Sequence, residues 1–150
     1  MKKYSTLIIL ALILMLSCEK DDICVETTTP RVIILFNNFD EPENSKELSS
    51  LTFWVNENDS IVLNQTIDSL AFPIDLTQNS TQYIFKTNNI KDTINLEYNR
   101  KDIFVSRSCG YKTIFEEVQN KSNTFNWVKD ITINQTTIEN ETATHITILH

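Results

Sequence analysis

Glycine occurs only once in the 150 residues, histidine occurs twice, and no HExxH, GxSxG or glycine-rich phosphate-binding motif is present. Catalysis at neutral pH usually requires a histidine, a reactive thiol, a metal or a pair of carboxylates in an unusual environment. The two histidines, His145 and His150, are five positions apart and fall on opposite faces of a strand, which favours core or surface roles over metal ligation. We therefore expect no enzyme, no metal site and no cofactor.

Positive charge is also scarce, because 13 Lys and Arg stand against 20 Asp and Glu and leave a formal charge of −7. An acidic chain repels phosphate backbones, which argues against nucleic acid as a partner. The length corresponds to a single domain.

No apolar run is long enough to cross a bilayer as a helix. The longest extends from Leu7 to Leu16, whereas a spanning helix needs roughly 20 residues. Lys2 and Lys3 precede it, and Ser17 and Cys18 follow it. This order of charged, apolar and small residues predicts a secretory signal peptide over residues 1–17.

The end of this leader, Leu14-Met15-Leu16-Ser17-Cys18, resembles the lipobox of bacterial lipoproteins. In such a motif the cysteine thiol receives diacylglycerol, and cleavage then makes that cysteine the N-terminus. The resemblance predicts that Cys18 is the lipid attachment site and that the protein is bound to a membrane through this anchor. The alternative is a conventional signal peptide with a chance cysteine.

The residues after Cys18 are charged. Glu19, Lys20, Asp21 and Asp22 resemble the signal by which Bacteroidota direct lipoproteins to the outer face of the outer membrane. We expect an outer-membrane lipoprotein at the cell surface, or else facing the periplasm, with a lipidated acidic tether over residues 18–29. A solvated linker without an export role is the alternative.

Two cysteines remain after Cys18. An exported protein can keep Cys24 and Cys109 as a disulfide, which would join the start of the domain to its second half. Two free thiols are the alternative.

Residues 30–150 consist of short apolar or alternating runs separated by Asn, Asp, Ser and Thr clusters, a pattern typical of antiparallel sheets. Leu51, Phe53 and Val55 alternate with polar or outward-facing positions, and Pro73 indicates a sheet edge. The pattern predicts an all-β fold, an antiparallel β-sandwich or a partly closed barrel of about eight or nine short strands, after a cleaved N-terminal signal helix.

Three local features refine this expectation. Asn88–Asn89 and Asn99–Asp102 are predicted turns. Gly110 is predicted to have a positive φ, since only glycine adopts it without cost. The residues Ile114, Phe115 and Val118 have helical as well as strand spacing, so a short helix is an alternative there.

Several segments together resemble an uncharacterised family of Bacteroidota lipoproteins, a domain of unknown function. The segments are Asp22-Ile23-Cys24, Thr28-Thr29-Pro30-Arg31, Val105 to Lys112, Trp127 and His145-Ile146. The resemblance spans the chain after the leader, and Ser106 to Lys112 is its most specific element. It implies an envelope location and a β-rich fold, and it supports the Cys24–Cys109 bridge, but it implies no activity.

Arg107, Tyr111 and Lys112 flank Cys109 and form a candidate binding patch, both basic and aromatic, on an otherwise acidic molecule. Such a patch could hold an anion or a sugar ring. The alternative is that the two cations pair with nearby acids while Tyr111 packs beside the disulfide.

Three tripeptides match the Asp-Ser/Thr-apolar pattern that Bacteroidota use for O-glycosylation of exported proteins. The hydroxyl residues of these tripeptides are Ser60, Ser69 and Thr93. The same tripeptide also arises wherever an Asp turn enters a strand.

The sequence thus favours a non-catalytic, lipid-anchored binding module whose partner is an envelope protein or glycan. A structural or assembly factor for a neighbouring outer-membrane protein is the second hypothesis. A hydrolase is the third, and it would require two carboxylates that converge in a cleft.

Overall fold

A computed structural model describes residues 23–26, 28–56 and 62–150, and the described residues contain strands but no helix. The strands are β1 (Val32–Asn37), β2 (Leu48–Val55), β3 (Val62–Ile67), β4 (Ser69–Phe72), β5 (Ser80–Thr87), β6 (Ile90–Ser106), β7 (Gly110–Asn123), β8 (Asp130–Ile133) and β9 (Ile146–Leu149).

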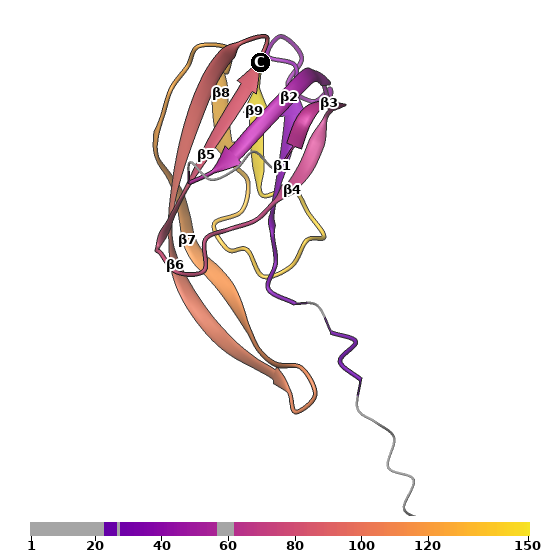
Figure 1. Cartoon of the computed structure of the whole chain (residues 1–150), viewed down its shortest axis with the longest axis vertical. Coiled ribbons are helices and arrows are strands. Elements are labelled where there is room, and N and C mark those ends of the chain that lie inside the picture. Colours follow the sequence, from indigo (N-terminus) through magenta and orange to yellow (C-terminus); the bar gives the residue numbers. More distant parts are fainter. Residues whose placement is uncertain (1–22, 27, 57–61) are drawn as a thin grey trace, which may run out of the picture.

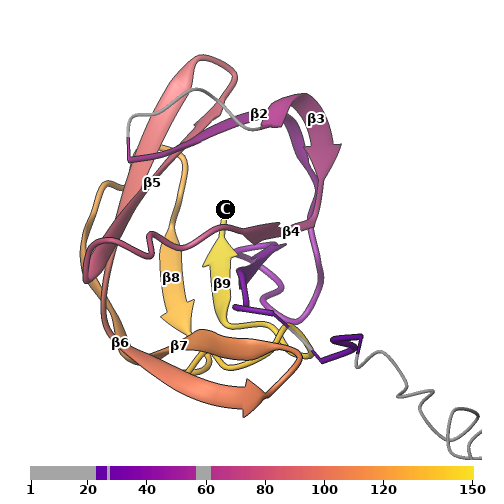
Figure 2. The same cartoon turned by 60° about the horizontal axis from the view of Figure 1, so that its bottom comes forward.

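The strands form two sheets that pack face to face (Figure 1). One has four strands in the order β4-β1-β9-β8, and the other has five in the order β3-β2-β5-β6-β7. All neighbours are antiparallel except β1 and β9, which pair in parallel. Viewed from below, the five-stranded sheet curves around the other without closing into a barrel (Figure 2). The expected β-sandwich is therefore confirmed.

The core lies between the two sheets and is rich in aromatic rings. Alternate residues of the strands point into it, so that Leu51, Phe53 and Val55 of β2 are buried as the sequence predicts. The rings of Phe53 and Phe72, from opposite sheets, meet edge to face at 4.3 Å between centroids. Aromatic pairs of this kind add about 0.5–1.5 kcal/mol beyond the area they bury.

The turn and edge predictions are mostly confirmed. Asn88 and Asn89 have φ values of 47° and 66° and join β5 to β6 in a two-residue hairpin, for which Asn is well suited. Gly110 has a φ of 73°. Strand β4 ends one residue before Pro73 and lies at a sheet edge.

The predicted turn at Asn99–Asp102 is wrong, because β6 continues through it for 17 residues in all. At this point the β6–β7 hairpin leaves the sandwich and extends beyond it (Figure 1). Both faces of the strand then meet solvent, which explains the polar run without a turn. We call this projecting part of the hairpin, residues 99–116, the arm. Two of the strands are consequently long rather than short.

The helical alternative around Ile114 is also wrong, because these residues belong to β7. The pairing of β6 with β7 shifts its register between Glu97 and Asn99, and Glu117 has a φ of 55°. The extra residue of this bulge places both Phe115 and Val118 in the core. Their three-residue spacing therefore imitates a helix.

The segment between β8 and β9 covers the outer edge of β7. Backbone N–H groups of Phe115 and Val118 donate to the carbonyl oxygens of Ile138 and Thr136, at 3.1 and 2.9 Å. This pairing places residues 139–141 beside the base of the arm, where the chain enters β1.

Candidate functional site

A disulfide joins Cys24 to Cys109, with 4.9 Å between the two Cα atoms. It links the segment before β1 to the turn at the tip of the arm. The same segment is held again where the N–H of Thr113 donates to the hydroxyl of Thr29 at 3.0 Å. The predicted bridge is confirmed, and the alternative of two free thiols is wrong. Cys24 and Thr29, assigned to the tether from sequence, are thus attached to the arm.

The three residues of the predicted patch lie near this disulfide, and two of them line a common hollow. Tyr111 is 72% exposed, and its ring meets Phe104 edge to face at 5.4 Å. The Nζ of Lys112 donates to the carbonyl oxygen of Glu139 at 3.1 Å. Tyr111 and Lys112 line a hollow of about 260 Å³ beside the disulfide, whereas Arg107 does not line it. Arg107 is exposed in the turn.

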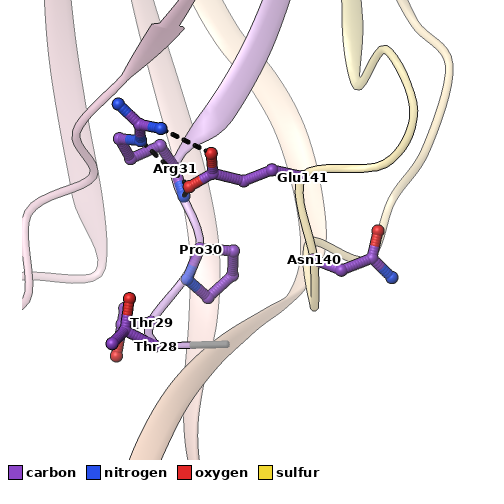
Figure 3. Close-up of a pocket in the computed structure, with 6 residues that line it drawn as sticks. All are labelled: Thr28, Thr29, Pro30, Arg31, Asn140 and Glu141. Atoms are coloured by element: carbon purple, nitrogen blue, oxygen red, sulfur yellow. Dashed lines mark hydrogen bonds and ion pairs between the residues drawn. The ribbon is translucent and has the colours of Figure 1, made fainter. Parts of the chain in front are cut away.

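A second, larger hollow of about 390 Å³ lies at the lower end of the sandwich, and we call it the basal pocket. It is lined by Thr28, Thr29, Pro30, Arg31, Asn140 and Glu141 (Figure 3). Thr28 and Thr29 line both hollows, so the entering segment separates two adjoining cavities. Hydroxyl, amide, guanidinium and carboxylate groups make the lining rich in hydrogen-bonding groups.

Arg31 and Glu141 form a two-pronged ion pair in this pocket (Figure 3). The guanidinium donates to the two carboxylate oxygens at 2.9 and 2.6 Å, and the backbone N–H of Arg31 adds a third bond of 2.9 Å. This hydrogen bonding raises the pKa of Arg31 and lowers the pKa of Glu141. Glu141 is therefore ionised at neutral pH. The pair is partly exposed, and such pairs stabilise a fold by about 0–1 kcal/mol.

Sequence reasoning did not identify this pocket. Arg31 and Glu141 are separated by 110 positions, and neither belongs to a recognisable motif. Only the parallel pairing of β1 with β9 brings the segment before β1 close to the segment before β9. The segment Thr28 to Arg31 attracted attention only through a family resemblance.

Two carboxylates, Glu97 and Glu117, line a smaller hollow of about 170 Å³ on β6 and β7. The hydrolase hypothesis requires such a pair. Each carboxylate already holds a partner, since Glu97 pairs with Lys121 at 2.9 Å and Glu117 accepts from the Asn99 amide at 2.7 Å. These exposed contacts give neither group the apolar environment that a general acid needs.

Both histidines have structural contacts. His145 is buried, and its Nδ1 accepts a hydrogen bond from the N–H of Ile33 at 2.8 Å. His150 contacts the Lys46 carbonyl oxygen through Nε2 at 3.1 Å. Burial lowers the pKa of both rings. Within the described ranges, no three His, Cys, Asp or Glu side chains gather as a metal site would require.

The three O-glycosylation candidates differ in their surroundings. Ser69 is exposed at the start of β4. Thr93 is half-buried within β6, and its neighbour Asp92 is inaccessible and accepts hydrogen bonds from Thr124 and residues 126–128. Ser60 lies outside the described residues. Modification of these hydroxyls stays a prediction.

The residues of the predicted anchor, Cys18 and Glu19 to Asp22, likewise lie outside the described residues. Across the part of the chain that is described, we find no helix with the length and hydropathy that a membrane span requires.

Comparison with known proteins identifies the domain but no activity. No curated protein and no solved structure matches the chain. A family model, described as a family of unknown function (DUF6452), matches residues 50–150. The match covers most of the strands and Cys109, and it ends short of Cys24 and of the lower-numbered half of the basal pocket. Because two thirds of the sequence match this model, the chain belongs to the DUF6452 family of unknown function.

Proposed function

We propose that the protein is a lipid-anchored, non-catalytic binding module of the bacterial outer membrane, and that it binds an envelope glycan in the basal pocket. It faces the cell surface or, failing that, the periplasm. The membrane anchor and the pocket are argued separately below, because different residues support them.

The anchor is supported by the leader and by the cysteine that ends it. Lys2 and Lys3, the apolar run Leu7 to Leu16 and Cys18 stand in the order that a lipoprotein leader requires. Each acyl methylene buried in a bilayer contributes about 0.8 kcal/mol, so two or three chains hold a water-soluble domain at the membrane. Glu19 to Asp22 support export to the outer face.

The basal pocket is the observation that carries the binding role. Its hydroxyl, amide and charged groups suit a ligand with many hydroxyls, because each can donate to or accept from a sugar. Glu141 is the carboxylate of the lining, and its lowered pKa leaves it without a proton to donate at neutral pH. The pocket is therefore better suited to binding than to acid catalysis.

The anchor is tested by metabolic labelling with palmitate and by membrane fractionation of Cys18→Ala. We expect this variant to lose the label and leave the membrane fraction. Cys109→Ala is the matched control and keeps the label, since its thiol is not the acylated one. A labelled, membrane-bound Cys18→Ala protein would disprove the lipoprotein proposal.

The binding role is tested on an array of muropeptides and lipopolysaccharide oligosaccharides with the purified, processed protein. We expect binding by the unaltered protein and its loss in Glu141→Gln, which removes the carboxylate that orients Arg31. Glu116→Gln is the control, because it breaks the exposed Lys101–Glu116 pair of 2.9 Å outside the pocket. Binding that is absent, or equal in all three proteins, contradicts the glycan proposal.

A further inference from the structure

Large apolar side chains are exposed at one end of the molecule. Ile23 and Val25, on either side of Cys24, are 77% and 87% exposed, and Phe104 and Tyr111 near the tip of the arm are 59% and 72% exposed. These four residues, which we call the tip cluster, are half of the eight large apolar side chains that are exposed in the described part of the chain. Such concentrations on a soluble domain usually mark a contact surface.

The exposure of the tip cluster is not a by-product of folding the sandwich. The arm extends beyond the other strands of both sheets (Figure 1), and the positions of β6 from Asn99 onward are exposed or half-buried. No core lies beneath Phe104 and Tyr111, which pack against each other across the hairpin. Polar residues there would satisfy the strand pairing equally well, so strand pairing does not account for the two exposed rings.

The disulfide sets where this surface lies relative to the lipid. Five residues separate Cys18 from Cys24, and an extended stretch of that length reaches about 20 Å. Because Cys24 is bonded to Cys109 at the tip of the arm, the tip stays within that reach of an acylated Cys18. A tether attached to any other part of the sandwich would not impose this restriction.

The composition of the tip suits the boundary between water and lipid. Aromatic rings settle at the level of the headgroups, and a guanidinium beside them can contact phosphates. Arg107 supplies that cation in the turn, and it has no ion-pair partner among the described residues. The acidic remainder of the domain is repelled by anionic headgroups, which favours contact through the tip.

We propose that the tip cluster inserts into the headgroup region of the bilayer that holds the lipid anchor. The arm then lies between the sandwich and the membrane, and it fixes the distance of the basal pocket from the bilayer and its orientation. This inference rests on the proposed lipidation of Cys18, but it adds a second, reversible membrane contact that lipidation alone does not require.

The test uses the natively processed, full-length protein reconstituted into vesicles of phosphatidylethanolamine and phosphatidylglycerol. A tryptophan is introduced by Phe104→Trp, and the quenching of its fluorescence by brominated phosphatidylcholine is measured. The parent protein contains Trp54 and Trp127, so its quenching is subtracted as background. Phe125→Trp is the matched control, because Phe125 is 58% exposed and follows the end of β7 farthest from the tip. Tyr111→Trp gives a second reading from the arm.

We expect the brominated lipid to quench the added fluorescence of Phe104→Trp and Tyr111→Trp, with a blue shift of their emission, and to leave Phe125→Trp unaffected. Protein that floats with the vesicles but shows no quenching at either arm position overturns the docking inference while the anchor stands. A blue shift that depends on protein concentration and not on lipid overturns it in favour of a second copy. Protein that does not float with vesicles overturns the anchor itself.

Discussion

The two halves of the β6–β7 hairpin are held in place by different forces. In the upper half, Ile94, Leu96 and Tyr98 alternate into the core, while the carboxylate of Asp92 is buried under six hydrogen-bond contacts to donors of the following loop. In the lower half, the arm buries only Ile114 and Phe115 at its base, and the rest depends on strand pairing, one ion pair and the Cys24–Cys109 bond. Covalent attachment thus replaces burial, which leaves the side chains of the arm available for outside contacts.

Among the changes that test the difference between the two halves of the hairpin, removal of the disulfide is expected to have the largest effect on stability. Cys24→Ser/Cys109→Ser frees a loop that spans 85 positions, and we expect the free energy of unfolding to fall by about 4–5 kcal/mol. Urea unfolding followed by circular dichroism measures the change. An unchanged unfolding midpoint would show that the arm is an appendage without influence on the sandwich.

Asp92→Ala tests the upper half. The change leaves the buried N–H groups of Trp127 and Val128, which donate at 2.7 and 2.9 Å, without an acceptor. We expect a loss of about 3 kcal/mol in the same urea assay. Burial opposes ionisation of Asp92, but the hydrogen bonds prevail and lower its pKa, so its contribution is present near neutrality and lost as the pH falls below 3.8.

Asp102→Ala is the control for that prediction, because Asp102 lies in the arm and accepts from the exposed Thr113 hydroxyl. We expect a change within about 0.5 kcal/mol. Equal losses for Asp92 and Asp102 would remove the distinction between the two halves.

The response to mild acid should also separate the two regions, because both histidines belong to the sandwich and none to the arm. Burial lowers the pKa of His145 below 6.5. On acidification the unfolded chain therefore binds a proton at this ring at a higher pH than the folded chain does. Stability is therefore complete above pH 6.5 and declines below it, by at most about 1.4 kcal/mol per pH unit for each histidine. Unfolding midpoints from pH 7.5 to 5 measure the slope, and His145→Gln should reduce it. An unaltered slope would contradict this assignment.

The smallest effect is expected at the tip. Phe104→Ser should change the free energy of unfolding by no more than about 0.5 kcal/mol, because the ring is mostly exposed. Phe85→Ser, in the core, should unfold at far lower urea. A large loss for Phe104→Ser would mean that the arm contains a packed core of its own.

Sequence patterns predicted those parts of the fold that depend on neighbouring residues. The alternation of Leu51, Phe53 and Val55 indicated a strand with one buried face, and Asn88–Asn89 indicated a turn because both residues tolerate a positive φ. The errors arose where one pattern has two physical causes. A polar run arises from a turn or from a strand exposed on both faces, and β6 at Asn99–Asp102 is the second.

The candidate site was predicted only in part. Cys24 and Cys109 could be paired because few thiols remained to choose from, and Tyr111 and Lys112 were found because they adjoin Cys109 in sequence. The Arg31–Glu141 pair gave no local indication, since a single Arg and a single Glu on the surface are the commonest of features. Their meeting depends on the pairing of β1 with β9.

The sequence by itself determined the all-β character and the turn at Asn88–Asn89, because alternation and φ preference are properties of adjacent residues. The leader that ends at Cys18 stays a prediction from the sequence. Only the tertiary structure decided that β6 and β7 continue as an arm, that Glu117 forms a bulge, and that the segments before β1 and before β9 enclose a pocket. Those features follow from contacts between distant segments, whose free energy depends on the packing of the whole sandwich.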